Sequence, residues 1–194
     1  LIVRQLTNLG LKKIAVFYQN DAYGKAGLDG VNRALAELKL TPVATATVER
    51  NSTDVKAAVD KLVPATPDAV VQITAYASAA AFVRAARKAG FGGTFYNVSF
   101  VGTQALADEL GKDGAGVVVS QVVPSPYQPS RQITREFLEA IKKGGDKVQP
   151  NYSSMEGYLA ARVFTEGLRQ TQAGGKITRE SFITGTESIG NQVI

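Results

Sequence analysis

The sequence predicts an α/β fold built on a doubly wound parallel sheet, and three observations support this prediction. Residues 14–18 and 69–74 consist mainly of apolar and β-branched residues, which is typical of strands buried on both faces. Each run leads through a short polar turn into apolar residues at helical spacing, such as Leu28, Val31 and Leu35. Short connections between alternating strands and helices favour a parallel sheet with helices on both faces.

The first part of the chain contains strand patterns that alternate with helical patterns. Strands are expected at residues 14–18, 42–49, 69–74, 94–98 and 115–123. Helices are expected at residues 1–9, 25–38, 55–62, 79–89 and 103–110. Glycines 10, 90 and 111 are expected to end three of these helices. Thr53 or Asp54 is expected to cap the third helix, and Ser78 is expected to start the fourth.

The second part of the chain has a different composition. Three prolines between residues 124 and 129 interrupt regular structure and indicate a crossover between two lobes. Helices are then expected at residues 130–143 and 153–170, and Thr178 is expected to cap a last short helix. The sequence shows no strand against which residues 153–194 can pack, so we expect their apolar face to need a partner elsewhere.

The composition argues against several function classes. The 194 residues include neither Cys nor His, so disulfides, thiolate metal sites, Cys nucleophiles and the commonest general base are excluded. The glycines form neither a Walker loop nor a dinucleotide fingerprint, because the pair Gly92-Gly93 precedes a strand instead of following one. We therefore expect a protein that is not an enzyme, with no catalytic residue, no metal site and no cofactor.

The charge pattern and the chain ends bear on partners and location. The net charge is +5, but the basic residues are dispersed, which favours a solvated surface over a nucleic-acid groove. No apolar run approaches the roughly 20 residues that span a bilayer, so we do not expect a membrane-embedded protein. The sequence starts without Met or a signal-peptide pattern, and Met155 is its only Met. We therefore expect a mature protein or a fragment.

The candidate ligand site follows from the fold class. In open α/β sheets, ligands bind outside the carboxyl ends of the strands. The turns expected there are rich in Tyr, amides and hydroxyls and poor in bases, which suits binding of a small polar molecule with an apolar body. The residues expected to line this crevice are Asn20, Asp21, Tyr23, Ala75, Tyr76, Ser99, Phe100, Pro124, Ser125 and Tyr127.

The sequence leaves the role of the carboxylates open. Asp21 either faces the ligand or caps the helix that follows the first strand, with Tyr23 packed at the start of that helix. Asp21 and Asp54 together also allow a metal or phosphoacceptor cluster, but one carboxylate per turn is what helix caps produce. The pair Asp108-Glu109 lies on an expected surface helix, so we do not expect acid–base catalysis there.

Four motifs resemble one protein family. Residues 21–27 (DAYGKAG), preceded by the strand IAVFYQN, resemble the second lobe of periplasmic solute-binding proteins of the leucine/isoleucine/valine-binding type. Residues 98–102, 117–126 and 152–158 are also similar to that family and occur in the same order, so the resemblance covers essentially the whole chain. The family comprises type I periplasmic binding proteins that serve ABC importers of branched-chain and related amino acids.

The resemblance implies a protein of two α/β lobes, joined by three crossovers, that closes on its ligand. Residues 1–149 correspond to the second lobe, and residues 150–194 to a segment that returns to a largely missing first lobe. By the same resemblance, the protein is periplasmic and binds a small amino acid of the branched-chain type or a related carboxylate. Its partner is then the permease of an ABC transporter.

The resemblance also implies roles for individual residues. Tyr23 matches a ligand-facing Tyr of the family, Tyr76 lies where a second Tyr approaches the ligand, and Tyr152 opens the fourth motif and joins the predicted ligand-binding residues. The branched-chain binders carry a Glu after the fourth strand, where this chain has Ser99 and Phe100. Either Asp21 compensates for the missing carboxylate, or the ligand is a different small carboxylate.

Two other function classes are less consistent with the sequence. The ligand-sensing core of a transcription regulator or receptor has the same fold, but a regulator needs an upstream helix-turn-helix that this sequence lacks. A flavodoxin-like enzyme needs a phosphate-cradling turn or a nucleophile–base pair, and the sequence contains neither pattern.

Overall fold

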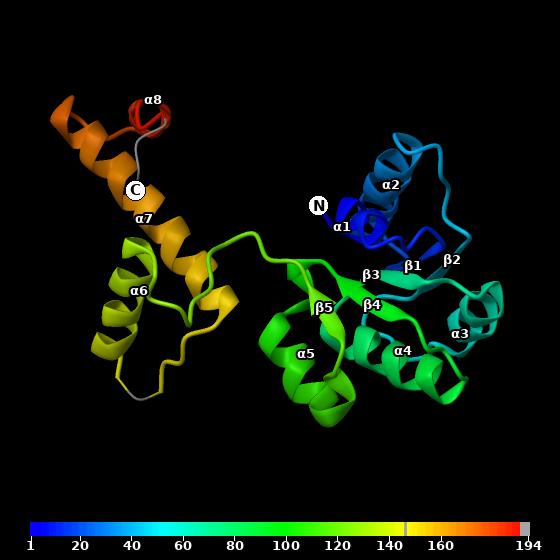
Figure 1. Ribbon diagram of the computed structural model, residues 1–194. Coiled ribbons are helices and arrows are strands. Elements are labelled where there is room, and N and C mark those ends of the chain that lie inside the picture. Colours follow the sequence, from blue (N-terminus) through cyan, green and yellow to red (C-terminus); the bar gives the residue numbers. More distant parts are fainter. Residues whose placement is uncertain (146, 191–194) are drawn as a thin grey trace. The chain divides into compact units, whose positions relative to one another are not determined.

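The computed structural model describes residues 1–145 and 147–190. Contacts divide the chain into two compact units, Leu1–Val122 and Val123–Ile194. The described residues of the first unit form a parallel sheet in the order β2-β1-β3-β4-β5, with helices on its faces (Figure 1). Those of the second unit are helices and connections. The predicted α/β fold with a doubly wound parallel sheet is therefore confirmed.

Two central strands are buried along almost their whole length. β1 (Ile14–Gln19) and β3 (Ala69–Ile73) are neighbours in the sheet, and all of β3 is buried, as is β1 except for Tyr18. Burial on both faces explains why these strands are mainly apolar and do not alternate with polar residues, although each contains one buried glutamine, Gln19 or Gln72. The remaining strands are β2 (Ala44–Val48), β4 (Thr94–Asn97) and β5 (Val117–Val119).

Helices cover both faces of this sheet (Figure 1). The helices on one face are α3 (Lys56–Leu62), α4 (Tyr76–Lys88) and α5 (Thr103–Leu110). Those on the other face are α1 (Ile2–Asn8) and α2 (Ala22–Ala36). Short 3₁₀ helices in the connections are η1 (Val63–Ala65), η2 (Ser99–Val101) and η3 (Gly111–Gly114). The rings of Phe17 and Phe82 stack at 4.3 Å between β1 and α4, so the face with α4 carries an aromatic core.

Two glycines allow α2 to lie close to the sheet. A Cβ on Gly24 would overlap the carbonyl oxygen of Gln19, and a Cβ on Gly27 would lie 2.6 Å from the side chain of Ile73. Real Cβ atoms do not approach other atoms this closely, so a larger residue at either position would force α2 to shift. The glycines therefore fix the start of α2 against the end of β1, where the sequence places the candidate site.

The second unit is built from helices around a small core. Its described helices are α6 (Gln132–Lys143), α7 (Tyr152–Ala173) and α8 (Arg179–Glu187). Phe137 and Met155 are buried, and the Phe137 ring packs edge-on to the ring of Tyr158 at 5.5 Å. A Cβ on Gly185 of α8 would overlap the hydroxyl oxygen of Thr171 on α7, which shows how closely these two helices pack.

Several predicted elements are confirmed. The helix at residues 103–110 has the predicted bounds, and Thr178 caps α8 by accepting a hydrogen bond from the Ser181 N–H. The first helix ends before Gly10, whose φ of 82° lies in the left-handed region that favours glycine. These signals depend on local residues, so the sequence predicted them well.

Several predictions of element bounds are wrong, including the following three. The strand predicted at residues 115–123 is only Val117–Val119, because β5 is an edge strand that pairs with the short β4. The helix predicted to start at Ser78 starts at Tyr76, and the Ser78 hydroxyl donates to the Ser52 carbonyl at 2.6 Å. The cap of α3 is Val55, although an Asp54 carboxylate oxygen accepts a bond from the Lys56 N–H at 3.3 Å.

The predicted division at residues 149 and 150 concerns the lobes of the whole protein. The compact units of this chain divide instead after Val122, so that α6 belongs with α7 and α8. Contacts within the chain do not test which lobe each segment joins in the whole protein, and the lobe boundary stays a prediction.

Candidate functional site

The strand order places a switch point at the centre of the sheet. After β1 the chain turns to α2 on one face, and after the neighbouring β3 it turns to α4 on the opposite face. Such a reversal leaves a crevice at the carboxyl ends of the two strands, where ligands of open α/β sheets bind. Residues 20–23 and 74–76 flank this point, as the sequence predicted.

Asp21 caps α2 with one carboxylate oxygen and holds a neighbouring side chain with the other. Its Oδ1 accepts a hydrogen bond from the Gly24 N–H at 3.0 Å, and its Oδ2 accepts one from Gln19 Nε2 at 2.5 Å. The bond from Gly24, followed by the bond from Gln19, keeps the pKa of Asp21 below its ordinary value. Asp21 is therefore ionised at neutral pH, and both of its oxygens are engaged.

Tyr23 and Phe100 form an aromatic pair at the same edge. Their ring centroids lie 4.6 Å apart, although the two residues follow different strands. The Tyr23 hydroxyl is buried and has no hydrogen-bond partner among the described residues. Burial, with a smaller effect of the Asp21 charge, raises the pKa of Tyr23 to about 12, so the hydroxyl stays protonated at neutral pH. Phe100 is 70% exposed, so one aromatic surface is open to solvent.

The other predicted residues of this edge are polar or partly exposed. Ala75 is the N-cap residue of α4, and Tyr76 is its first residue, with 42% of its surface exposed. Ser99 starts η2, and its carbonyl oxygen accepts a bond from the Gly102 N–H. Within residues 1–145, where α4 lies, no side chain caps the start of this helix.

Glu49 and Arg50 lie near Asn20 and Asp21 and were not among the predicted site residues. Asn20 Nδ2 donates to Oε1 of Glu49 at 2.7 Å, and Arg50 follows close enough to lower the pKa of Asp21 by charge. Both residues come directly after β2, whose end lies beside that of β1. Ligands bind at the carboxyl ends of parallel strands, and this rule applies to β2 as well. Applying it to the end of β2 would have predicted residues 49 and 50 as part of the site.

Tyr127 and Tyr152 belong to the second unit. Their rings are perpendicular, with centroids 5.9 Å apart, and Tyr127 is 49% exposed. Ser125 lies in the same segment, and its carbonyl oxygen accepts a bond from the Thr134 hydroxyl at 3.4 Å. The predicted site residues thus form one group at the sheet edge of the first unit and one aromatic pair in the second.

The structure shows what the carboxylates do. Asp21 and Asp54 each accept a backbone N–H, as expected for helix starts. Within residues 1–145 and 147–190, no three acidic, Cys or His side chains gather into a possible metal site. In the same part of the chain, no helix is long and apolar enough to cross a bilayer.

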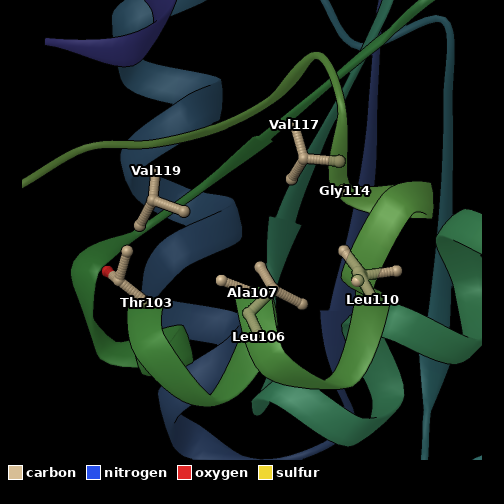
Figure 2. Close-up of a pocket in the computed structure, with 8 residues that line it drawn as sticks. Thr103, Leu106, Ala107, Leu110, Gly114, Val117 and Val119 are labelled. Atoms are coloured by element: carbon tan, nitrogen blue, oxygen red, sulfur yellow. The ribbon is translucent and has the colours of Figure 1, made fainter.

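A separate apolar pocket lies between α5 and β5. Its volume is about 250 Å³, and Figure 2 shows Leu106, Leu110, Val117 and Val119 lining it. The one hydroxyl among its lining side chains belongs to Thr103, which accepts a bond from Gln121 Nε2 at 2.6 Å. Because this lining is apolar and carries no charge, the pocket lacks the convergent polar groups that mark a small-molecule site.

Comparison with known families identifies the chain. Residues 2–192 match the family described as periplasmic binding protein. The chain belongs to this family. A comparison with curated proteins gives no significant match.

Solved structures of periplasmic binding proteins agree with this assignment. A substrate-binding periplasmic protein from Ralstonia solanacearum is 30% identical, with a TM-score of 0.89, and the match covers 100% of this chain and 55% of that one. A possible leucine/isoleucine/valine-binding protein from Rhodopirellula baltica SH 1 is 29% identical, with a TM-score of 0.93 and coverage of 100% and 53%. The present chain thus has the type I periplasmic-binding-protein fold, as predicted.

A more distant structure shares the fold alone. A fatty acid ABC transporter substrate-binding protein from Thermomonospora curvata is 21% identical, with a TM-score of 0.85, and the match covers 96% of this chain and 49% of that one. The chain therefore spans about half the length of the solved periplasmic binding proteins that it matches.

Proposed function

We propose that the protein binds a small solute with an apolar body at the carboxyl edge of its first unit. One observation carries this proposal: the buried, unpartnered Tyr23 hydroxyl lies beside an open aromatic surface at the switch point of the sheet. A buried donor without a partner is unfavourable, so a ligand acceptor that reaches it is stabilised. Membership of the periplasmic binding protein family supports a binding role.

The proposed ligand is an amino acid of the branched-chain type or a related carboxylate. The name of the Rhodopirellula protein, at 29% identity, supports this class. The ligand-binding residues in the proposal are Tyr23, Tyr76, Ser99 and Phe100, with Asn20, Asp21 and Ala75 shaping the edge around them. Tyr127 and Tyr152 are proposed to contribute from the second unit.

We further propose that the protein acts outside the cytoplasm as the solute-binding component of an ABC importer. In this proposal residues 1–149 form the second lobe and residues 150–194 return to the first. Ligand closes the two lobes, and the transporter permease recognises the closed form. The half-length match to solved binding proteins supports this division, as do Val163 and Phe164, which stay exposed on α7.

The test is to find the ligand and then to remove the Tyr23 hydroxyl. Native mass spectrometry of the full-length protein is expected to show a co-purified small molecule. Tyr23→Phe is expected to weaken its binding by about three- to tenfold in calorimetry, the effect of one neutral hydrogen bond.

Tyr96→Phe is the matched control, because Tyr96 lies within β4 and is buried in the core that α1 and α2 cover, so the loss of its hydroxyl should leave affinity unchanged. Equal affinities of wild type and Tyr23→Phe would refute the role of Tyr23. Absence of any bound or titratable carboxylate or amino acid would refute the function.

A further inference from the structure

We infer that the side chain of Phe100 is a gate: it covers the Tyr23 hydroxyl in the free protein, swings aside for the ligand, and then packs on the ligand's apolar body. This inference rests on the proposed function and adds a movement to it. It follows from the different exposure of two residues that touch each other, because the hydroxyl proposed to meet the ligand is buried while the ring beside it is largely open to solvent.

The Tyr23 hydroxyl cannot meet a ligand without a rearrangement. Its oxygen is buried and has no hydrogen-bond partner among the described residues. A ligand atom has to come within about 3 Å of this oxygen to form a hydrogen bond with it. Part of the cover over Tyr23 must therefore move before the proposed bond can form.

Tyr23 itself is held in place. It is the second residue of α2, and the adjacent Gly24 N–H donates to Oδ1 of Asp21 at 3.0 Å. A Cβ on Gly24 would overlap the carbonyl oxygen of Gln19, so the backbone is already packed closely against the end of β1. The Tyr23 side chain also packs against the core that α1 and α2 cover. The movement is therefore expected in its other neighbour, Phe100, whose ring centroid lies 4.6 Å from that of Tyr23.

Phe100 is free to move, whereas the residue after it is not. Phe100 is 70% exposed, so swinging away from Tyr23 uncovers less than a third of its surface. Val101 is 2% exposed and anchors the segment in the core on the α4 face. Rotation of an exposed side chain about its own bonds takes picoseconds to nanoseconds. The gate can thus open while the backbone stays in place.

The backbone at Phe100 supports this arrangement. Phe100 is the middle residue of η2, a single turn closed by bonds from the Val101 N–H to the Val98 carbonyl at 3.0 Å and from the Gly102 N–H to the Ser99 carbonyl at 3.2 Å. Gly102 has a φ of 80°, which glycine adopts readily, and α5 begins directly after it. The turn therefore fixes the main chain of Phe100 at the carboxyl edge and leaves its side chain to move.

The gate also couples two features of the proposed ligand. While the ring covers the hydroxyl, this polar group stays unpaired, which is unfavourable. A polar group of the ligand that displaces the ring bonds to the hydroxyl, and the aromatic surface of Phe100 becomes available to the apolar body. This coupling favours molecules that carry both a polar group and an apolar body over molecules that carry only one of them.

The first experiment measures access to the hydroxyl and needs no ligand. Full-length protein freed of carried-over ligand is treated near neutral pH with N-acetylimidazole, which acetylates accessible tyrosine hydroxyls, and peptide mass spectrometry follows Tyr23 separately. In Phe100→Ala, Tyr23 is expected to react at least about fivefold faster than in the wild type, because the hydroxyl no longer waits for the gate to open. Phe100→Leu, which keeps a smaller apolar side chain, is expected to give an intermediate rate.

Tyr76→Ala is the matched control for this measurement. Tyr76 is another partly exposed aromatic residue at the same edge, and its removal should leave the rate at Tyr23 unchanged. Equal rates at Tyr23 in the wild type and in Phe100→Ala would overturn the inference and leave the proposed function standing.

The second experiment tests the movement during binding. Stopped-flow fluorescence measures the association of L-leucine and of 4-methylpentanoate with the wild type and with Phe100→Ala. Association is expected to be at least about threefold faster in the variant, because no ring has to move, and dissociation is also expected to be faster, because the ligand loses an apolar contact. Equal or slower association in the variant would overturn the inference. Failure of both compounds to bind the wild type would overturn the proposed ligand class, and the inference with it.

Discussion

The two compact units of this chain differ in how completely they bury their own apolar surface. In the first unit, helices lie on both faces of the sheet, and Phe17, Phe82 and Phe95 have no exposed surface. In the second unit, Phe164 and Ile183 are 55% and 49% exposed, although the Phe164 ring contacts that of Phe182 at 5.1 Å. A large exposed apolar surface indicates a contact that the unit does not make by itself.

This difference has a consequence for function. Tyr23 and Phe100 lie at the edge of a sheet whose core is fully buried within the first unit. The positions of these two residues are therefore determined by contacts within that unit. In the second unit, Tyr127 and Tyr152, which are proposed to bind ligand, belong to a unit that leaves more of its apolar side chains exposed. We therefore expect substitutions in the first unit to change stability more than equivalent substitutions in the second.

The largest expected difference is between two phenylalanines. Phe17→Ala removes a fully buried ring that stacks on Phe82, and it is expected to lower the free energy of unfolding by about 3–5 kcal/mol. Phe164→Ala removes a ring that is 55% exposed, and the expected loss is below about 1 kcal/mol. Urea unfolding of the full-length protein measures both. Similar losses would show that the second unit is also closely packed around Phe164.

The next largest difference concerns glycines in helices. Gly24→Ala puts a Cβ into the Gln19 carbonyl and is expected to destabilise the protein by about 1–3 kcal/mol or more. Gly157→Ala on α7 meets no atom within 4 Å and is expected to stabilise it by about 0.5–1 kcal/mol. Thermal unfolding of the two variants should therefore shift in opposite directions. A neutral Gly24→Ala would mean that α2 can move away from β1 without cost.

A smaller effect is expected in alkaline solution. The pKa of Tyr23 is raised from 10.0 to about 12, so its contribution to stability is complete below pH 10 and is lost as the pH rises toward 12. Tyr23→Phe is expected to remove this part of the pH dependence. Absorbance at the tyrosinate band and unfolding between pH 9 and 12 measure it, with Tyr158→Phe in the second unit as the comparison. An unchanged alkaline profile in Tyr23→Phe would contradict the burial of its hydroxyl.

The smallest effect is expected for Asp21→Asn. Asn caps helices about as well as Asp, but its single oxygen cannot also accept the Gln19 amide, so stability at neutral pH should fall by about 0.5–1.5 kcal/mol, the value of one hydrogen bond. The pKa of Asp21 is lowered in the folded protein, so its carboxylate stabilises the fold above its ordinary pKa of 3.8, and this contribution is lost as the pH falls through the lowered value. As the pH falls below 3.8, the free energy of unfolding should therefore decrease less in Asp21→Asn than in the wild type. A large loss at pH 7 would show that the negative charge itself is needed.

Several features of the site were predictable from the chain alone. The strand and helix periodicities gave the α/β class, and the turn after the first strand placed Asn20, Asp21 and Tyr23 at the carboxyl edge. The sequence offered two roles for Asp21, and its hydrogen bond with Gly24 shows that it caps α2. The contact of Tyr23 with Phe100 was not predictable from the sequence. It depends on the order of the strands in the sheet and on how the segments that follow them pack.

The sequence by itself determined the alternation of buried strands and amphipathic helices, because hydrophobic periodicity and capping residues act over a few neighbouring positions. Only the tertiary structure decided the strand order, and with it the short length of β5, the bond between Asn20 and Glu49 and the nearness of Arg50 to Asp21. It also decided that the Tyr23 hydroxyl is buried without a partner in the described part of the chain. Burial and hydrogen bonding between residues far apart in sequence depend on how whole elements pack, which no local pattern encodes.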